Sequence, residues 1–154
     1  MKKFLIGVVF PIFLVIAGIG AIIYGYVETS NAKASNSWPV VQGKILSSEV
    51  GSYLSRSAMR YIPKISYEFE VDGEVFTGKK VMFADVESSS KGSPQRLVSK
   101  YPQGSSADVY YKPENPAVSV LLPGNKGLRT SAGYLFGGLL LAMSIGVFFQ
   151  MRTS

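Results

Sequence analysis

Few kinds of side chain that could carry chemistry are present in this chain of 154 residues, because it contains no cysteine and no histidine. This composition excludes thiolate nucleophiles, disulfides, imidazole metal ligands and every triad with a histidine base. A serine cluster, Ser88–Ser90, follows Lys79 and Lys80, and a lysine can activate a serine hydroxyl. Serine-rich stretches are more typical of turns, so the favoured interpretation is a solvated loop.

Four carboxylates alternate along one predicted hairpin: Glu68, Glu70, Asp72 and Glu74. A hard cation requires oxygen ligands that converge from a loop, whereas alternate residues of a strand point along one face. We therefore expect these side chains to be solvated. The sequence predicts no catalytic residue, no metal ligand and no cofactor.

A basic cluster with aromatic and aliphatic residues interleaved occupies residues 53–64. Its candidate contact residues for a partner or lipid are Arg56, Arg60, Tyr61 and Lys64, with Tyr53, Leu54 and Met59 between them. Such a mixture can bind single-stranded nucleic acid, but acidic residues nearly match basic ones between the apolar ends of the chain, which argues against nucleic acid. Membrane lipid with anionic head groups or a protein partner fits better, and a solvated loop with snorkelling side chains stays open.

Two apolar segments flank the part of the chain that holds these residues. Overall, 47% of the residues are hydrophobic and only 17% are charged, and no charge occurs in residues 4–26 or 132–149. A membrane-spanning helix needs about 20 apolar residues. We therefore predict transmembrane helices over both ranges, rather than a purely cytosolic protein.

The first apolar segment has a second interpretation, as a cleaved signal peptide. Lys2 and Lys3 would be its charged start, and Ala32-Lys33-Ala34 its cleavage site. The apolar run exceeds the roughly 7–15 residues of a signal peptide, so we expect it to be retained. Two lysines directly before the first span favour cytoplasmic termini and a module outside the cytoplasm.

Small residues recur at every fourth position of both apolar segments: Ala17, Ala21 and Gly25 in the first, and Gly138, Ala142 and Gly146 in the second, with Gly133 and Gly137 beside the second row. Such rows let helices approach closely in a membrane. They predict either an antiparallel helix pair within one chain or a homo-oligomer.

The segment between the spans, residues 38–122, is predicted to be β-rich. Strands are expected at residues 40–50, 64–71, 74–81, 107–111 and 117–122, with Gly43 as a possible bulge and a short helix from Ser93-Pro94. Polar linkers are expected at residues 27–37 and 123–131. The predicted fold class is membrane α plus soluble β: a two-pass helical hairpin flanking a small antiparallel β barrel or sandwich.

One hairpin within this module can be predicted in register. Asp72-Gly73 is a strong two-residue turn signal, so Val71 should pair with Glu74. Phe69 then faces Phe76 as a cross-strand aromatic pair, and Tyr67 covers the bare backbone of Gly78. The alternation places Phe69 on a buried face and Glu70 on a polar one.

These features resemble a bacterial membrane-protein family catalogued as domain of unknown function 3592. The resemblance rests on WPVVQGKILSSEV, on YIPKISYEFEVDGEVFTGKKV and on YPQGSSADVYYKPENPAVSVLLPG. It implies a β-module anchored in a bacterial inner membrane, and it brings no catalytic residues.

The function that these observations favour is a non-enzymatic one. We expect a membrane-anchored module that binds a protein or envelope component close to the bilayer, in an accessory, assembly or immunity-type role, with an exposed strand edge as the docking site. The alternative is an envelope hydrolase that uses serine or carboxylate chemistry.

Overall fold

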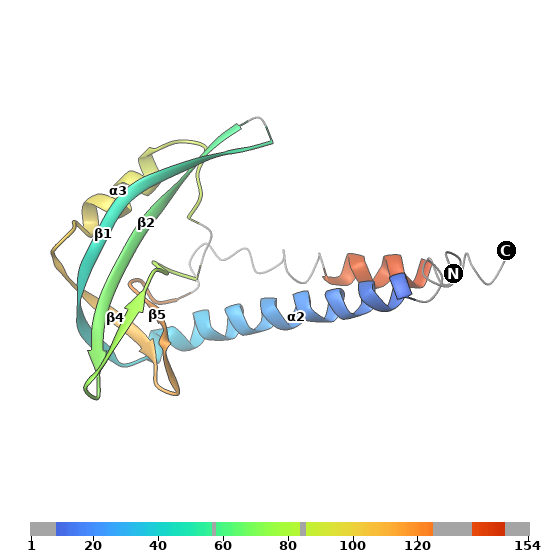
Figure 1. The fold of residues 1–154 in the computed structure, drawn as a ribbon, viewed down its shortest axis with the longest axis horizontal. Helices are drawn as coiled ribbons and strands as arrows, with labels where there is room; N and C mark the ends of the chain where they lie inside the picture. Colours follow the sequence, from blue (N-terminus) through green and yellow to red (C-terminus); the bar gives the residue numbers. More distant parts are fainter. Residues whose placement is uncertain (1–8, 57, 84–85, 125–136, 147–154) are drawn as a thin grey trace. The chain divides into compact units, whose positions relative to one another are not determined.

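The computed structural model describes residues 9–56, 58–83, 86–124 and 137–146 (Figure 1). The chain divides into two compact units. One comprises Met1–Ser30 with Arg129–Ser154, and the other comprises Asn31–Leu128.

The helix α2 (Phe10–Ala34) dominates the first unit. With the short 3-10 turn that follows it, α2 forms a 28-residue helix, Phe10–Ser37, that is long and apolar enough to cross a membrane. A second apolar helix, Gly137–Gly146, is shorter than a span. The predicted two-pass hairpin is therefore corrected, within the described residues, to one helix of spanning length, and the rest of residues 132–149 lies outside them.

The predicted linker at residues 27–37 is wrong, because α2 continues through it to Ala34. Ala32 and Ser35 are completely buried in the second unit. The Ser35 hydroxyl donates to the Ala32 carbonyl at 2.8 Å and accepts from the Gly124 N–H at 2.8 Å. Tertiary contacts thus hold a helix where composition alone indicated a loop.

The second unit is built on one antiparallel sheet of five strands. They are β1 (Val40–Ser55), β2 (Ala58–Val71), β3 (Glu74–Gly78), β4 (Ser106–Lys112) and β5 (Asn115–Val120). Their order is β3-β2-β1-β4-β5, and the helix α3 (Gly92–Lys100) packs against β1 and β2.

The sheet is open, so the predicted closed barrel or sandwich is wrong. Its edge strands β3 and β5 approach each other, but no ladder joins them among the described residues. They are linked instead through Val81, whose carbonyl accepts from the N–H groups of Leu121 at 3.1 Å and Leu122 at 2.8 Å. A strongly curled sheet can thus enclose a core without closing.

The register predicted for the β2–β3 hairpin is confirmed. Val71 pairs with Glu74, and Phe69 pairs with Phe76, with the two rings stacked and their centroids 5.8 Å apart. Tyr67 pairs with Gly78, where an added Cβ would lie 2.3 Å from the Tyr67 ring. The glycine is needed because the tyrosine ring occupies the space of a side chain.

The main core lies on one face of the sheet, which we call the core face. Its buried members are Ile45, Ile65, Tyr67, Phe69, Val81, Tyr101, Ala107, Val109 and Leu121. The Tyr67 hydroxyl donates to the Lys80 carbonyl at 2.9 Å and lies 3.2 Å from the Ser119 hydroxyl. Burial raises the Tyr67 pKa to about 12, and the Ser119 hydrogen bond lowers it in part.

The strands β1 and β2 are longer than predicted, and they form one curved hairpin (Figure 1). Residues 51–63, which the sequence did not assign to a strand, are strand on both sides of a tight turn at Arg56, which has a positive φ of 47°. The bulge lies between Ile45 and Ser47 rather than at Gly43. Gly43 serves close packing, because an added Cβ would lie 2.7 Å from the Glu68 carbonyl oxygen.

Candidate functional site

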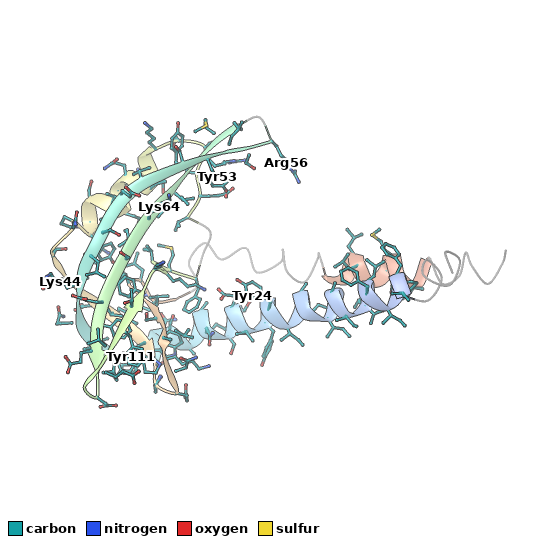
Figure 2. All side chains as sticks on the ribbon, in the orientation of Figure 1. Tyr24, Lys44, Tyr53, Arg56, Lys64 and Tyr111 are labelled. Carbon is teal, nitrogen blue, oxygen red and sulfur yellow. The ribbon has the colours of Figure 1, made fainter. Side chains whose placement is uncertain are left out.

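The predicted contact residues lie on the far end of the β1–β2 hairpin, at residues 50–62 and just beyond. We call residues 50–62 the distal half. Successive strand residues point to opposite faces, so Arg60 and Lys64 share the face opposite the core face, while Tyr61 points to the core face. Arg56 lies at the tip, and Figure 2 shows it beyond Tyr53 and Lys64. The structure therefore divides the predicted patch between two faces and a turn.

Arg60 is paired rather than free for a ligand. Its Nε lies 3.9 Å from a carboxylate oxygen of Glu87, and the hydroxyl of Tyr53, its cross-strand neighbour, donates to the same carboxylate. The Arg60–Glu87 contact is an ion pair rather than a hydrogen bond, because the Arg60 Nε is buried with no hydrogen-bond partner among the described residues.

Tyr61 joins β2 to the segment that precedes α3. Its N–H and carbonyl exchange two hydrogen bonds of 2.9 Å with Ser88, and the Lys91 ammonium lies 5.6 Å from the centre of its ring. This cation–π contact and the backbone bridge give Tyr61 a structural role.

Lys64 lines a polar groove that the sequence did not predict. Its aliphatic stem lies over Gly51, where an added Cβ would come within 2.5 Å of the Lys64 Cε. The groove has a volume of about 460 Å³ and is lined by Ser47, Glu49, Pro63, Lys64, Ile65, Ser66 and Lys79. The hydroxyls of Ser47 and Ser66 lie 2.6 Å apart within it. Glu49 is the cross-strand partner of Lys64, so the groove carries both signs of charge.

The apolar residues of the distal half are the ones left exposed. Leu54 is 70% exposed and Met59 is 44% exposed, and the two are cross-strand partners on the core face. No described element covers them, although the same face is packed at the base of the hairpin. Neighbouring exposed apolar side chains of this kind can belong to a larger apolar contact surface.

Two of the groups considered for hydrolysis make local contacts. The Ser88 hydroxyl accepts the Ser90 N–H at 3.2 Å, and the Lys80 ammonium lies 4.8 Å from the centre of the Phe83 ring. In the part of the chain that the structure describes, no three acidic side chains come together as a metal site.

In the first unit, the close contact between the helices involves Gly137, which lies beside the predicted second row. The close contact is between Gly18 and Gly137, where an added Cβ on Gly137 would lie 2.8 Å from the Gly18 carbonyl oxygen and 2.5 Å from Ile22. Beyond it, Pro11 and Ile12 lie near Ser144 and Ile145, so the two helices are antiparallel.

The predicted rows are offset from this contact. The positions of Gly138 and Gly146 have open space around them, and Ala142 is exposed. Ala17, Ala21 and Gly25 are only partly buried. A four-residue spacing identifies a helix that can pack closely, but neighbouring small residues leave the packing face ambiguous.

Comparison with known proteins shows which family the chain matches. The family described as domain of unknown function (DUF3592) matches residues 41–126, which is more than half of the chain. The chain belongs to this family, and the predicted resemblance is confirmed. No curated protein matches the chain, and no solved structure matches it.

Proposed function

We propose that this chain is a membrane-anchored, non-enzymatic module that binds a protein or envelope component near the bilayer, in an accessory, assembly or immunity-type role. The observation that carries the proposal is the exposed pair of Leu54 and Met59 on a hairpin that extends past its own core. The two residues adjoin on one face, where they can form part of an apolar contact surface for a partner.

Retention of the N-terminal helix is part of this proposal. Cleavage after Ala34 would remove Ala32, which is completely buried in a second core cluster with Trp38, Phe83 and Val120. It would also remove the carbonyl that accepts from the Ser35 hydroxyl. The module as folded therefore uses residues that a signal peptidase would remove.

The two-pass arrangement and its orientation complete the proposal. The antiparallel contact between α2 and Gly137–Gly146 supports a second span over residues 132–149, and the two lysines that precede the first span favour cytoplasmic termini. The module then lies outside the cytoplasm of a bacterial inner membrane.

Topology can be tested with cysteine variants, because the natural chain has none. We expect Ser37→Cys to react with a membrane-impermeant maleimide in intact cells, and Ser154→Cys to stay unreactive. Reaction at position 154 alone would reverse the orientation. Intact mass of the extracted protein tests retention, and a mature chain that starts at Ser35 would refute it.

The binding role is tested by affinity purification of the full chain from detergent extracts. We expect Leu54→Glu with Met59→Glu to lose the co-purifying partner. Val75→Glu is the matched control, because Val75 is an exposed apolar residue on β3 (65% exposed). Equal retention by both variants would contradict a binding role for the distal half.

A further inference from the structure

The edge of β1 that faces away from β2 bonds to β4 at its base, but to no strand further along in the described residues. At the base, β4 pairs with residues from Val40 to Lys44, and the next residue is still bonded: the Ile45 N–H donates to the Ser105 carbonyl at 2.9 Å, and the Ile45 carbonyl accepts from Gly104 at 2.8 Å. Past the bulge, no strand continues this ladder in the described residues. Ser48 is covered by α3, because its hydroxyl donates to the Val98 carbonyl.

The hydrogen bonds of Tyr61 show in which direction the backbone N–H and carbonyl groups of β1 point at residues 50–54. Its N–H and carbonyl point away from β1, because both bond to Ser88. Ser52 is the cross-strand partner of Tyr61, so its N–H and carbonyl point away from β2. By alternation, the same holds for Val50 and Leu54. Among the described residues, no backbone partner bonds these three N–H groups and three carbonyls, which form an open edge.

In the part of the chain that the structure describes, this edge has none of the usual protection against pairing. Exposed edges are normally blocked by charged residues, by proline or by a covering segment. The other side of the hairpin has such protection, in the form of Pro63 and the Ser88 bridge. By contrast, Val50–Ser55 contains no charge and no proline, so its sequence is suited to pairing with another strand.

We propose that a second copy of this chain pairs with β1 along Val50–Ser55, antiparallel and with Ser52 opposite Ser52. This inference rests on the proposed binding role of the distal half and names the occupant of its edge. Pairing two identical segments brings no like charges face to face, because the segment is uncharged. The register places residues with outward-pointing backbone groups opposite each other, as an antiparallel ladder requires.

The side chains are complementary in the same register. Val50 of one copy lies opposite Leu54 of the second copy on the core face, which forms an apolar cross-strand pair. Glu49 lies opposite Ser55 of the second copy, one residue from the Arg56 cation. The exposed apolar pairs of the two copies then lie on the same face of the joined sheet, on either side of the Ser52 pair at the two-fold axis.

Cross-linking of the full chain in native membranes tests the register. Under mild oxidation, we expect Ser52→Cys to form a disulfide-linked species with the mass of two chains, because the two cysteines meet at the two-fold axis. Ser99→Cys is the matched control, since it is exposed on α3, and we expect it to stay monomeric. Equal cross-linking at both positions, or an adduct with the mass of another protein, would overturn the proposal.

A charge-swap experiment separates pairing from chance collision. Ser52→Lys and Ser52→Glu should each be monomeric in detergent by light scattering, because like charges meet at the axis. A mixture of the two variants should regain the dimer. A monomeric wild-type chain, or variants that dimerise as the wild type does, would refute self-pairing.

These outcomes are distinguishable from failure of the proposed function. Loss of partner in Leu54→Glu with Met59→Glu, together with a monomeric wild-type chain, would refute the dimer and leave partner binding in place. A second combination has the opposite meaning: the wild-type background cross-links at position 52, but the Leu54→Glu, Met59→Glu variant keeps every co-purifying protein. That result would support the dimer and refute partner binding by the distal half.

Discussion

The two halves of the β1–β2 hairpin share a strand pair but differ in their surroundings. At the base, β3 and β4 flank the pair, and Ile45, Tyr67 and Phe69 are buried. In the distal half, the same face carries Leu54 and Met59, which are exposed. Backbone pairing is thus continuous along the hairpin, whereas the core ends partway along it. The base of the hairpin is therefore part of a packed core, whereas the distal half leaves apolar side chains exposed.

The largest expected loss of stability is at the base of the β1–β2 hairpin. Phe69→Ala should destabilise the module by about 3–5 kcal/mol, because it removes a buried ring that stacks on Phe76. Glu70→Ala, one residue along and exposed, should be nearly silent in a denaturant titration. Equal losses in the two variants would mean that the base half is not a core.

Tyr67 provides a pH test of the same half. Its pKa is raised to about 12 by burial, so the folded state holds the phenol proton more tightly than the unfolded state, whose pKa is near 10. The stabilisation is complete below pH 10 and is lost as the pH rises through 12, by roughly 2–3 kcal/mol. Tyr67→Phe should lack this share of the alkaline loss, and an unchanged pH slope would contradict the burial of the hydroxyl.

A substitution at Gly78 tests how closely the Tyr67 ring packs against this glycine. Gly78→Ala should cost about 1–3 kcal/mol, as overpacking does, because its Cβ would collide with the Tyr67 ring. Gly92→Ala is the matched control, since the nearest atom to its Cβ is the Ser90 Oγ at 4.0 Å. If thermal unfolding shows no difference between the two variants, the ring does not cover Gly78.

The difference between the base and the distal half of the hairpin explains which strands could be predicted from the sequence. The alternation of Ile65, Tyr67 and Phe69 reflects a packed face, so both the strand and the Asp72-Gly73 hairpin register could be predicted. Residues 53–64 lack such alternation, because the main core ends before them and their side chains make individual contacts, as Tyr61 does with Lys91 and Arg60 with Glu87. Their strand structure depends on pairing with each other, which a local pattern does not encode.

Long-range contacts account for the other differences between the predicted and the observed structure. The helix through residues 27–34 depends on burial of Ala32 and Ser35 among residues far along the chain. The open form of the sheet depends on where Val81 meets Leu121 and Leu122. In the candidate site, the residue types of the patch were predictable, but the pairing of Arg60 with Glu87 was not, because it joins segments far apart in sequence.

The smallest expected effect is on stability in the distal half. Leu54→Ala and Met59→Ala should each change the free energy of unfolding by less than about 0.5 kcal/mol, as for exposed sites. A loss comparable to that of Phe69→Ala would show that the distal half belongs to the core and would remove the distinction between the two halves.

Residue-resolved amide hydrogen exchange of the full chain in lipid nanodiscs tests most directly whether the distal edge is occupied. The amides of Gly51 and Tyr53 point toward β2 and should be protected under all conditions. We predict that the amides of Val50, Ser52 and Leu54 are protected as well, and that Ser52→Lys abolishes protection at these three positions alone. Fast exchange at Val50, Ser52 and Leu54 in the wild-type chain, beside protected Gly51 and Tyr53, would contradict the account.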